Sequence, residues 1–296
     1  METIQLVRAY LLSLSVALLG CGCGKVREGP VHGRVLEVQE EGDAIRVDFS
    51  RGWFGGSTEL QVVVEPGDLL WLKDGRDIRG DLVRKGAGYK LQSIWPDLKS
   101  EEAQIQKKNT LLRRNTVDRG VAAFRETGEE IPEFALYDQD GTVVSNDYLK
   151  GRVSVLHFIF TRCSMPSMCP ASTQKMGRLL EVVKSESLED VRLISISLDP
   201  RFDTPGVLKS YARGYGVDAP QSRFLTGPLQ PVQDLKKQLG ILSKPDEALI
   251  IKHTMRTILI GPDLRIAYHV PNSSWDVEDF LAKIREMNKA DPLLIE

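Results

Sequence analysis

Two cysteines stand close together in the sulfur-rich stretch FTRCSMPSMCP, which runs from Phe160 to Pro170. The chain has four cysteines in all, and five residues, including Met165 and Met168, separate Cys163 from Cys169. Such a pair can close a small disulfide ring or hold a soft metal ion between two thiolates. Because ring closure would contribute only roughly 2 to 2.5 kcal/mol of chain entropy, the spacing favours a redox or metal role over a structural disulfide.

The elements on either side of this stretch would place it at the end of a buried strand. Residues 153–160 (VSVLHFIF) form a nearly continuous apolar run, which is typical of a strand buried on both faces. A helix is predicted to begin at Pro170 and a second buried strand to span Val191 to Leu198, which completes a βαβ unit. Cys169 would then occupy the helix N-cap, where backbone N–H groups and the helix dipole favour a thiolate.

The rest of the C-terminal half continues this pattern. Thr204 can cap a helix that has Pro205 at its first position, and two strands, TMRTILIG and RIAYHV, follow. A last helix, Trp275 to Asn288, would bury one apolar face formed by Val277, Phe280, Leu281 and Ile284. The expected fold over residues 128–296 is an α/β thioredoxin-like domain, with a central mixed sheet flanked by helices.

The N-terminal half has a different character. Residues 30–98 contain six short alternating stretches, one of them DLLWLK at residues 68–73, which predict a small all-β barrel domain. With His32 and no methionine, this segment is expected to be a structural or partner-binding module rather than a metal site. Residues 99–127 would form a helical linker, capped by Ser100 and solvated as a connector between the domains.

Residues 1–21 have the features of an export signal that ends in a lipobox. An apolar stretch ends at Leu18-Leu19-Gly20-Cys21, and Cys21 is the expected lipidation site; the alternative is an uncleaved signal anchor. These features predict a protein of the bacterial cell envelope, anchored to the membrane by lipid and facing the periplasm. The formal net charge of -2 provides no basic field for a phosphate backbone, so we expect no nucleic-acid partner.

Four motifs resemble the Sco/SenC copper chaperones in the order shown by that family. They are FIFTRC followed by CP, ISLDPRFDTPGVLKSYARGYG, FLTGP and KHTMRTILIGPDLRI, and the resemblance covers about residues 128–290. It implies copper, as Cu(I) or Cu(II), bound by Cys163, Cys169 and His253, with Asp199 as an acidic residue close to the site. The implied partners are the cytochrome c oxidase subunit that carries the copper centre, other copper carriers, and thiol reductases.

The sequence also departs from the family and leaves alternatives open. The family usually has fewer residues between its cysteines than the five found here, and Met165 and Met168 are candidate auxiliary ligands in the longer loop. The main alternative is an exported thiol-disulfide oxidoreductase that uses Cys163 and Cys169 without transferring metal, so enzymatic activity is left open beside the favoured metallochaperone. A peroxiredoxin-like peroxidase is disfavoured because its Pro-x-x-x-Thr-x-x-Cys pattern does not precede Cys163.

The remaining histidines of this half carry less weight. His157 lies within the apolar strand, where a hydrogen-bonded core histidine is expected, and His269 lies in a late strand. Neither has a ligand-like neighbour in the sequence. His253 differs because it begins a strand after a polar stretch that could fold over the cysteines.

Overall fold

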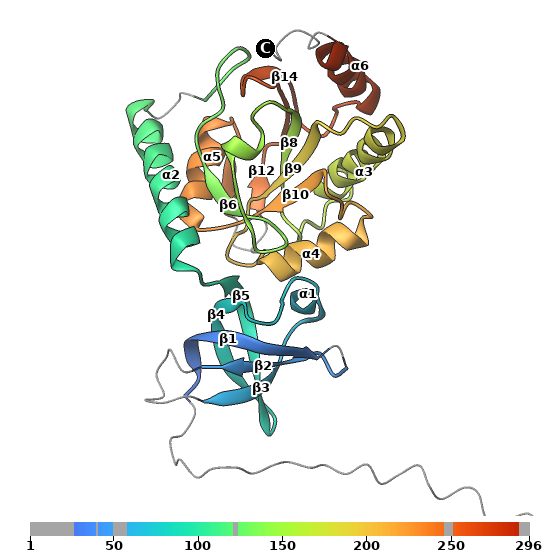
Figure 1. Ribbon diagram of the computed structural model, residues 1–296. Coiled ribbons are helices and arrows are strands. Elements are labelled where there is room, and N and C mark those ends of the chain that lie inside the picture. Colours follow the sequence, from blue (N-terminus) through green and yellow to red (C-terminus); the bar gives the residue numbers. More distant parts are fainter. Residues whose placement is uncertain (1–26, 40, 50–57, 121–123, 246–250, 290–296) are drawn as a thin grey trace, which may run out of the picture.

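The computed structural model describes residues 27–39, 41–49, 58–120, 124–245 and 251–289. Within this part of the chain, a five-stranded barrel lies at one end of a larger α/β unit, and helix α2 runs along the side of that unit (Figure 1). The predicted domain boundaries near residues 98 and 127 stay predictions. The signal and lipobox of residues 1–21 lie outside the described residues.

The barrel closes in the strand order β1-β2-β3-β5-β4. Its core consists of the inward-facing residues that alternate with outward-facing ones along the strands. Among them, Val35, Ile45, Leu82 and Leu91 are fully buried. Its elements are β1 (Gly29–Gln39), β2 (Ala44–Asp48), β3 (Glu59–Val63), α1 (Pro66–Leu69), β4 (Asp77–Lys85) and β5 (Gly88–Pro96).

One of the six predicted strands is wrong. The stretch DLLWLK begins within α1 rather than in a strand, because Pro66 starts a short helical turn. Trp71, which follows this turn, is 1% exposed and packs in the barrel core cluster.

The α/β unit is built on a mixed five-stranded sheet of order β10-β9-β8-β13-β14. Strands β8, β9 and β10 are parallel, whereas β13 runs antiparallel to both β8 and β14. The strands of this sheet are β8 (Val153–Ile159), β9 (Val191–Ser197), β10 (Ser222–Leu225), β13 (Arg256–Ile260) and β14 (Ile266–Pro271). The other elements are β6 (Ala135–Tyr137), β7 (Val143–Ser145), η1 (Asn146–Tyr148), α3 (Cys169–Ser185), α4 (Pro205–Gly214), α5 (Leu229–Gln238), β11 (Ser243–Pro245), β12 (Ile251–His253) and α6 (Val277–Lys289).

Local sequence signals place most of these elements correctly. All seven residues of β8 are buried, as its continuous apolar run predicts, and Thr204 caps α4 by accepting a hydrogen bond from the Val207 N–H. In α6 the predicted face is buried at Phe280, Leu281 and Ile284. Helices α3 and α6 pack against each other and against β8, so the strand that leads to the cysteines is covered on this face.

Helix α2 (Lys99–Asp118) is not the solvated connector that its polar sequence suggests. It packs against α5 and β6, and its buried residues include Asn109 and Thr116. The Asn109 amide donates to the Ala135 carbonyl at 2.8 Å and accepts from the Ala135 N–H at 3.0 Å. A polar side chain of α2 therefore forms hydrogen bonds with both backbone groups of Ala135 in β6. The N-cap is Leu98 rather than the predicted Ser100.

The barrel contacts the α/β unit through α1 and α4. A Cβ at Gly67 would lie 2.3 Å from the Gly206 carbonyl oxygen, and a Cβ at Gly206 would lie 2.2 Å from Asp68 Oδ1, so the two backbones approach as only glycines allow. Asp68 is 4% exposed, and burial raises its pKa to about 7. A carboxyl group of the barrel is therefore enclosed against the first turn of α4.

None of the helices in the described ranges combines the length and the apolar character needed to cross a bilayer.

Candidate functional site

The two cysteines flank a compact loop that links β8 to α3. Within it, the Met168 N–H donates to the Met165 carbonyl at 3.0 Å, and the Ala171 N–H donates to the Pro166 carbonyl at 3.1 Å. These turns fold the five intervening residues so that Cys163 interacts directly with Cys169. Both side chains are thiols, Cys163 half-buried and Cys169 buried. The loop therefore presents one accessible sulfur backed by one enclosed sulfur.

Cys169 is the first residue of α3, and Met168, not Cys169, is the N-cap. Burial raises the pKa of the Cys169 thiol, and the neighbouring Cys163 raises it further. The expected thiolate at a helix N-cap is thus wrong for the apo protein, because desolvation outweighs the helix dipole at this depth. The Cys169 thiol would lose its proton when its sulfur binds a soft cation or forms a disulfide bond.

The predicted acidic residue, Asp199, lies beside the cysteine loop. Its carboxylate accepts from Arg162 Nε at 3.2 Å and from Arg162 Nη2 at 2.5 Å, and Arg162 immediately precedes Cys163. The same guanidinium stacks 4.3 Å from the ring centre of Phe202, which is 43% exposed. Asp199 therefore reaches the site through Arg162.

The loop methionines lie differently. Met165 is half-exposed, and its carbonyl oxygen accepts a long contact of 3.9 Å from Cys163 Sγ. Met168 is partly buried at the N-cap of α3. Their role as auxiliary ligands stays a prediction.

Sequence reasoning missed Asp203, which fixes the start of the loop. Its buried carboxyl group accepts hydrogen bonds from Thr161 Oγ1 and Ser197 Oγ, both at 2.5 Å, and from the Thr161 N–H at 3.3 Å. Burial raises the pKa of Asp203 to about 6, although these hydrogen bonds oppose the rise. One signal was available: Asp203 directly precedes the Thr-Pro cap of α4 within the DPRFDTP motif.

His157 is a hydrogen-bonded core histidine, as predicted. It is 1% exposed, with Nδ1 at 2.9 Å from Ser172 Oγ and Nε2 at 2.7 Å from Ser195 Oγ. Burial lowers its pKa to about 3, so the imidazole is neutral. Since Trp275 Nε1 also donates to Ser172 Oγ at 3.0 Å, this network ties α3 to β8, β9 and the segment before α6.

His269 lies in β14, and its Nε2 pairs with Glu126 Oε2 at 3.1 Å rather than with a residue of the cysteine loop.

The third predicted ligand, His253, ends β12, where its backbone pairs with Ser243 of β11. Strand β13 begins three residues later and runs antiparallel to β8, with Thr257 opposite His157. The start of β13 therefore lies at the same edge of the sheet as the end of β8, from which the cysteine loop leaves. Backbone topology brings His253 to that edge, and its place as a ligand stays a prediction.

The donor set at this edge is compatible with a soft cation. Two adjacent thiols, one of them buried, suit Cu(I) better than a hard divalent ion. Among the side chains that the structure describes, no cluster of three or more Cys, His, Asp and Glu residues forms a complete metal site. The described geometry brings two candidate sulfur donors together, and His253 stays the predicted third ligand.

Comparison with known proteins gives a consistent result. Residues 122–289 match the family model described as SCO1/SenC. A SCO1 protein homolog of Bacillus subtilis (strain 168) is 37% identical over 140 residues, which cover 46% of this chain and 71% of that protein. A Stutzerimonas stutzeri protein named for copper binding is 34% identical over 146 residues, 47% of this chain and 68% of that one.

Among solved structures, a SCO1/SenC family lipoprotein from Bacillus anthracis str. Ames superposes with a TM-score of 0.51 at 28% identity. The superposition covers 56% of this chain and 99% of that chain.

Proposed function

The chain belongs to the SCO1/SenC family, and from this premise we propose that it is a copper-binding chaperone that supports assembly of the copper centre of cytochrome c oxidase. The observation that carries the proposal is the contact between the half-buried Cys163 and the buried Cys169 at the end of β8. The similarity to a Stutzerimonas stutzeri protein named for copper binding supports the choice of metal. The cargo is copper, held by Cys163, Cys169 and His253.

Two thiolates and an imidazole suit low-coordinate Cu(I), which is soft and prefers sulfur ligands. In this arrangement Cys163 is the accessible ligand from which a recipient could take the ion, whereas Cys169 is enclosed by the core. Copper must displace the proton of each thiol, so binding tightens as pH rises. Asp203 and Asp199 act on the loop rather than on the ion, by holding Thr161 and Arg162.

The second candidate function is thiol-disulfide exchange without metal transfer, and the same cysteine contact favours it. Oxidation of Cys163 and Cys169 to a disulfide would release two protons and pass two electrons to an acceptor disulfide, which becomes two thiols. This chemistry has no need of an imidazole. His253 therefore discriminates between the two functions.

The partners follow from the proposed cargo. They are the oxidase subunit that carries the copper centre, other copper carriers, and thiol reductases that keep the cysteines reduced.

We place the protein in the bacterial cell envelope, facing the periplasm and anchored through lipid on Cys21. The similarity to a Bacillus anthracis lipoprotein of the same family supports the anchor. A Cys21→Ser variant should remain an unlipidated precursor, and residues upstream of Cys21 in the mature wild-type protein would rule lipoprotein processing out.

Anaerobic Cu(I) titration of the reduced full-length protein, with copper and free thiols counted together, tests the proposed function. Wild type should bind one Cu(I), and Cys163→Ser and Cys169→Ser should each lose both tight copper binding and disulfide formation. His253→Ala should keep thiol-disulfide exchange while its copper affinity falls by about 10-fold or more. Equal Cu(I) affinity of His253→Ala and wild type would favour the oxidoreductase.

A further inference from the structure

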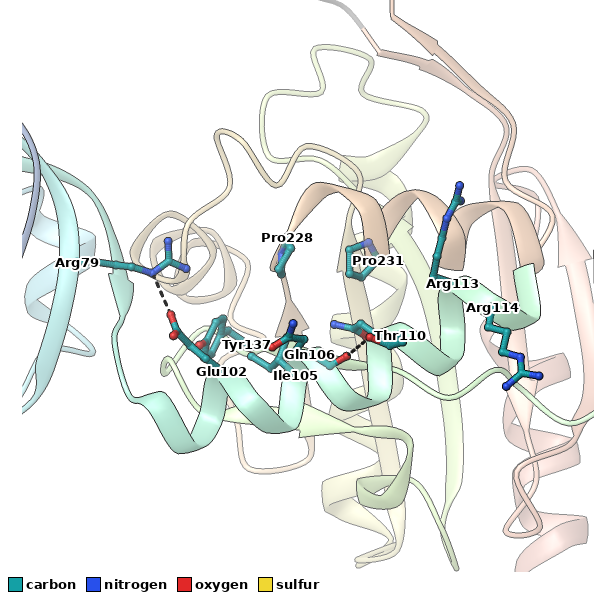
Figure 2. A pocket seen from close by; sticks show the side chains of 11 residues that line it. Arg79, Glu102, Ile105, Gln106, Thr110, Arg113, Arg114, Tyr137, Pro228 and Pro231 are labelled. Carbon is teal, nitrogen blue, oxygen red and sulfur yellow. Dashed lines mark hydrogen bonds and ion pairs between the residues drawn. The ribbon is translucent and has the colours of Figure 1, made fainter. Parts of the chain in front are cut away.

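A pocket of about 610 Å³ lies between helix α2, the start of α5 and the barrel strand β4 (Figure 2). Arg79 closes one end from the barrel, and Arg113 of α2 marks the other end. The family match begins at residue 122, so the barrel and α2 contribute residues from outside the matched part of the chain. The pocket is thus separate from the cysteine loop and from the function proposed for it.

Most of the exposed surface of the pocket is apolar, although charged and polar side chains, Glu102 among them, also line it. Ile105 of α2 lies opposite Pro228, the N-cap of α5, and Pro231, in the first turn of α5 (Figure 2). The ring of Tyr137 lies close to Ile105 in this view. These side chains would accommodate an aliphatic or aromatic body.

A buried hydrogen-bond donor belongs to one of the residues that line this pocket. Tyr137 is 1% exposed, and among the described residues its phenolic oxygen has no hydrogen-bond partner. Burial raises the pKa of Tyr137 to about 12, so the phenol keeps its proton. A buried hydroxyl without a partner is costly, which makes an acceptor on a bound molecule favourable.

Arg79 supplies a second donor at the same end. Its Nε is also buried without a hydrogen-bond partner in the described part of the chain, although it lies 3.9 Å from Glu102 Oε1 in an ion pair across the barrel and α2. The guanidinium lies 6.0 Å from the Trp95 ring, and Trp95 in turn lies 6.3 Å from Tyr137. Two donors, one of them cationic, therefore gather where the barrel meets β6.

We propose that this pocket binds a small monocarboxylate with an apolar body. The carboxylate accepts from the Tyr137 hydroxyl and from Arg79, and the body lies along Ile105, Pro228 and Pro231. A single carboxylate is expected because Arg113, at the other end, donates a hydrogen bond to Asp234 at 2.9 Å, whereas Arg79 Nε makes none to the described residues. Arg114, also at that end, lies 4.0 Å from Asp118, and its side chain is 80% exposed.

Calorimetric titration of the full-length protein with octanoate tests this proposal, with octanol and acetate as matched probes. Octanoate should bind at least about 10-fold more tightly than either, because only octanoate has both the charged acceptor and the apolar body. Tyr137→Phe should weaken octanoate about 10-fold, since it removes one hydrogen bond to a charged group. Tyr148→Phe, whose hydroxyl donates instead to Pro220 O at 3.4 Å, is the matched control and should bind like wild type.

Tyr137→Phe should fold normally, because it keeps the ring and removes a hydroxyl that makes no hydrogen bond to the described residues. Arg79→Gln provides an independent variant and should also weaken octanoate while leaving octanol unchanged. The proposal would be overturned if octanol bound as tightly as octanoate, or if octanoate showed no saturable binding. It would also be overturned if both variants bound octanoate as tightly as wild type.

Discussion

Thr161 donates its backbone N–H to the buried carboxyl group of Asp203 at 3.3 Å, two residues before Cys163. The Thr161 and Ser197 hydroxyls donate to the same group, so one side chain joins the end of β8, the end of β9 and the start of α4. The conformation of the cysteine loop depends on this buried acceptor.

Asp203→Ala should lower the free energy of unfolding by about 3 kcal/mol, because it leaves buried donors without an acceptor. Urea unfolding followed by circular dichroism measures the change. Asp190→Ala, at an exposed turn before β9, is the matched control and should change stability by less than about 0.5 kcal/mol. Equal stability of the Asp203→Ala and Asp190→Ala variants would show that Asp203 does not hold the loop.

Asp68 should make stability depend on pH. Its pKa is raised by burial from 3.8 to about 7, so between these values the folded state binds more protons than the unfolded state. Stability from this group is therefore greatest at low pH and declines as pH rises towards 7, by at most on the order of 4 kcal/mol.

Asp68→Asn removes the titrating group, so its stability should fall less than that of wild type between about pH 4 and about pH 7. Urea midpoints measured at both ends of this range give the slopes. Asp74→Asn, in the exposed turn before β4, serves as control and should follow the wild-type slope. Parallel slopes for wild type and Asp68→Asn would contradict the enclosure of Asp68 against α4.

Two glycines of α4 should respond oppositely to alanine. Gly206→Ala places a methyl group 2.2 Å from Asp68 Oδ1, which should force α1 away from α4 and cost about 1 to 3 kcal/mol. Gly214→Ala meets no heavy atom within 4 Å and should stabilise the helix by about 0.4 to 1 kcal/mol. Thermal unfolding of both variants checks this, and similar midpoints would mean that the barrel does not contact α4 as described.

The double variant Met165→Leu and Met168→Leu tests the longer loop. Leucine keeps the apolar bulk and removes the thioethers, so Cu(I) affinity should change by less than about 3-fold if neither methionine binds the ion. Competition with a Cu(I) chelator measures the affinity. A much larger loss would make at least one thioether a ligand.

Local signals were sufficient where one residue type determined the structure. The apolar run of β8 required burial on both faces, and the Thr204-Pro205 pair started α4 in the predicted place. Residues whose role depends on distant partners were not predictable in this way. Asn109 and Thr116 look like solvated positions in the sequence, yet Asn109 completes the edge of β6 and Thr116 accepts from Gln238 at 2.7 Å.

The same limit applied to the site. Cysteine spacing identified the pair, but the burial of Cys169 depends on the packing of the whole core, and the role of Asp203 depends on Thr161, which is 42 residues away in the sequence. The pattern of apolar residues in DLLWLK predicted a strand and did not reveal that a short helix, α1, begins at Pro66.

X-ray absorption spectroscopy of the Cu(I)-loaded full-length protein tests the central claim most directly. With Cys163, Cys169 and His253 as ligands, the spectrum should fit two sulfur scatterers and one nitrogen scatterer, and the nitrogen should disappear or be replaced in His253→Ala. A copper shell without sulfur, or a shell that is unchanged in Cys169→Ser, would contradict the claim that the cysteine pair at the end of β8 binds copper.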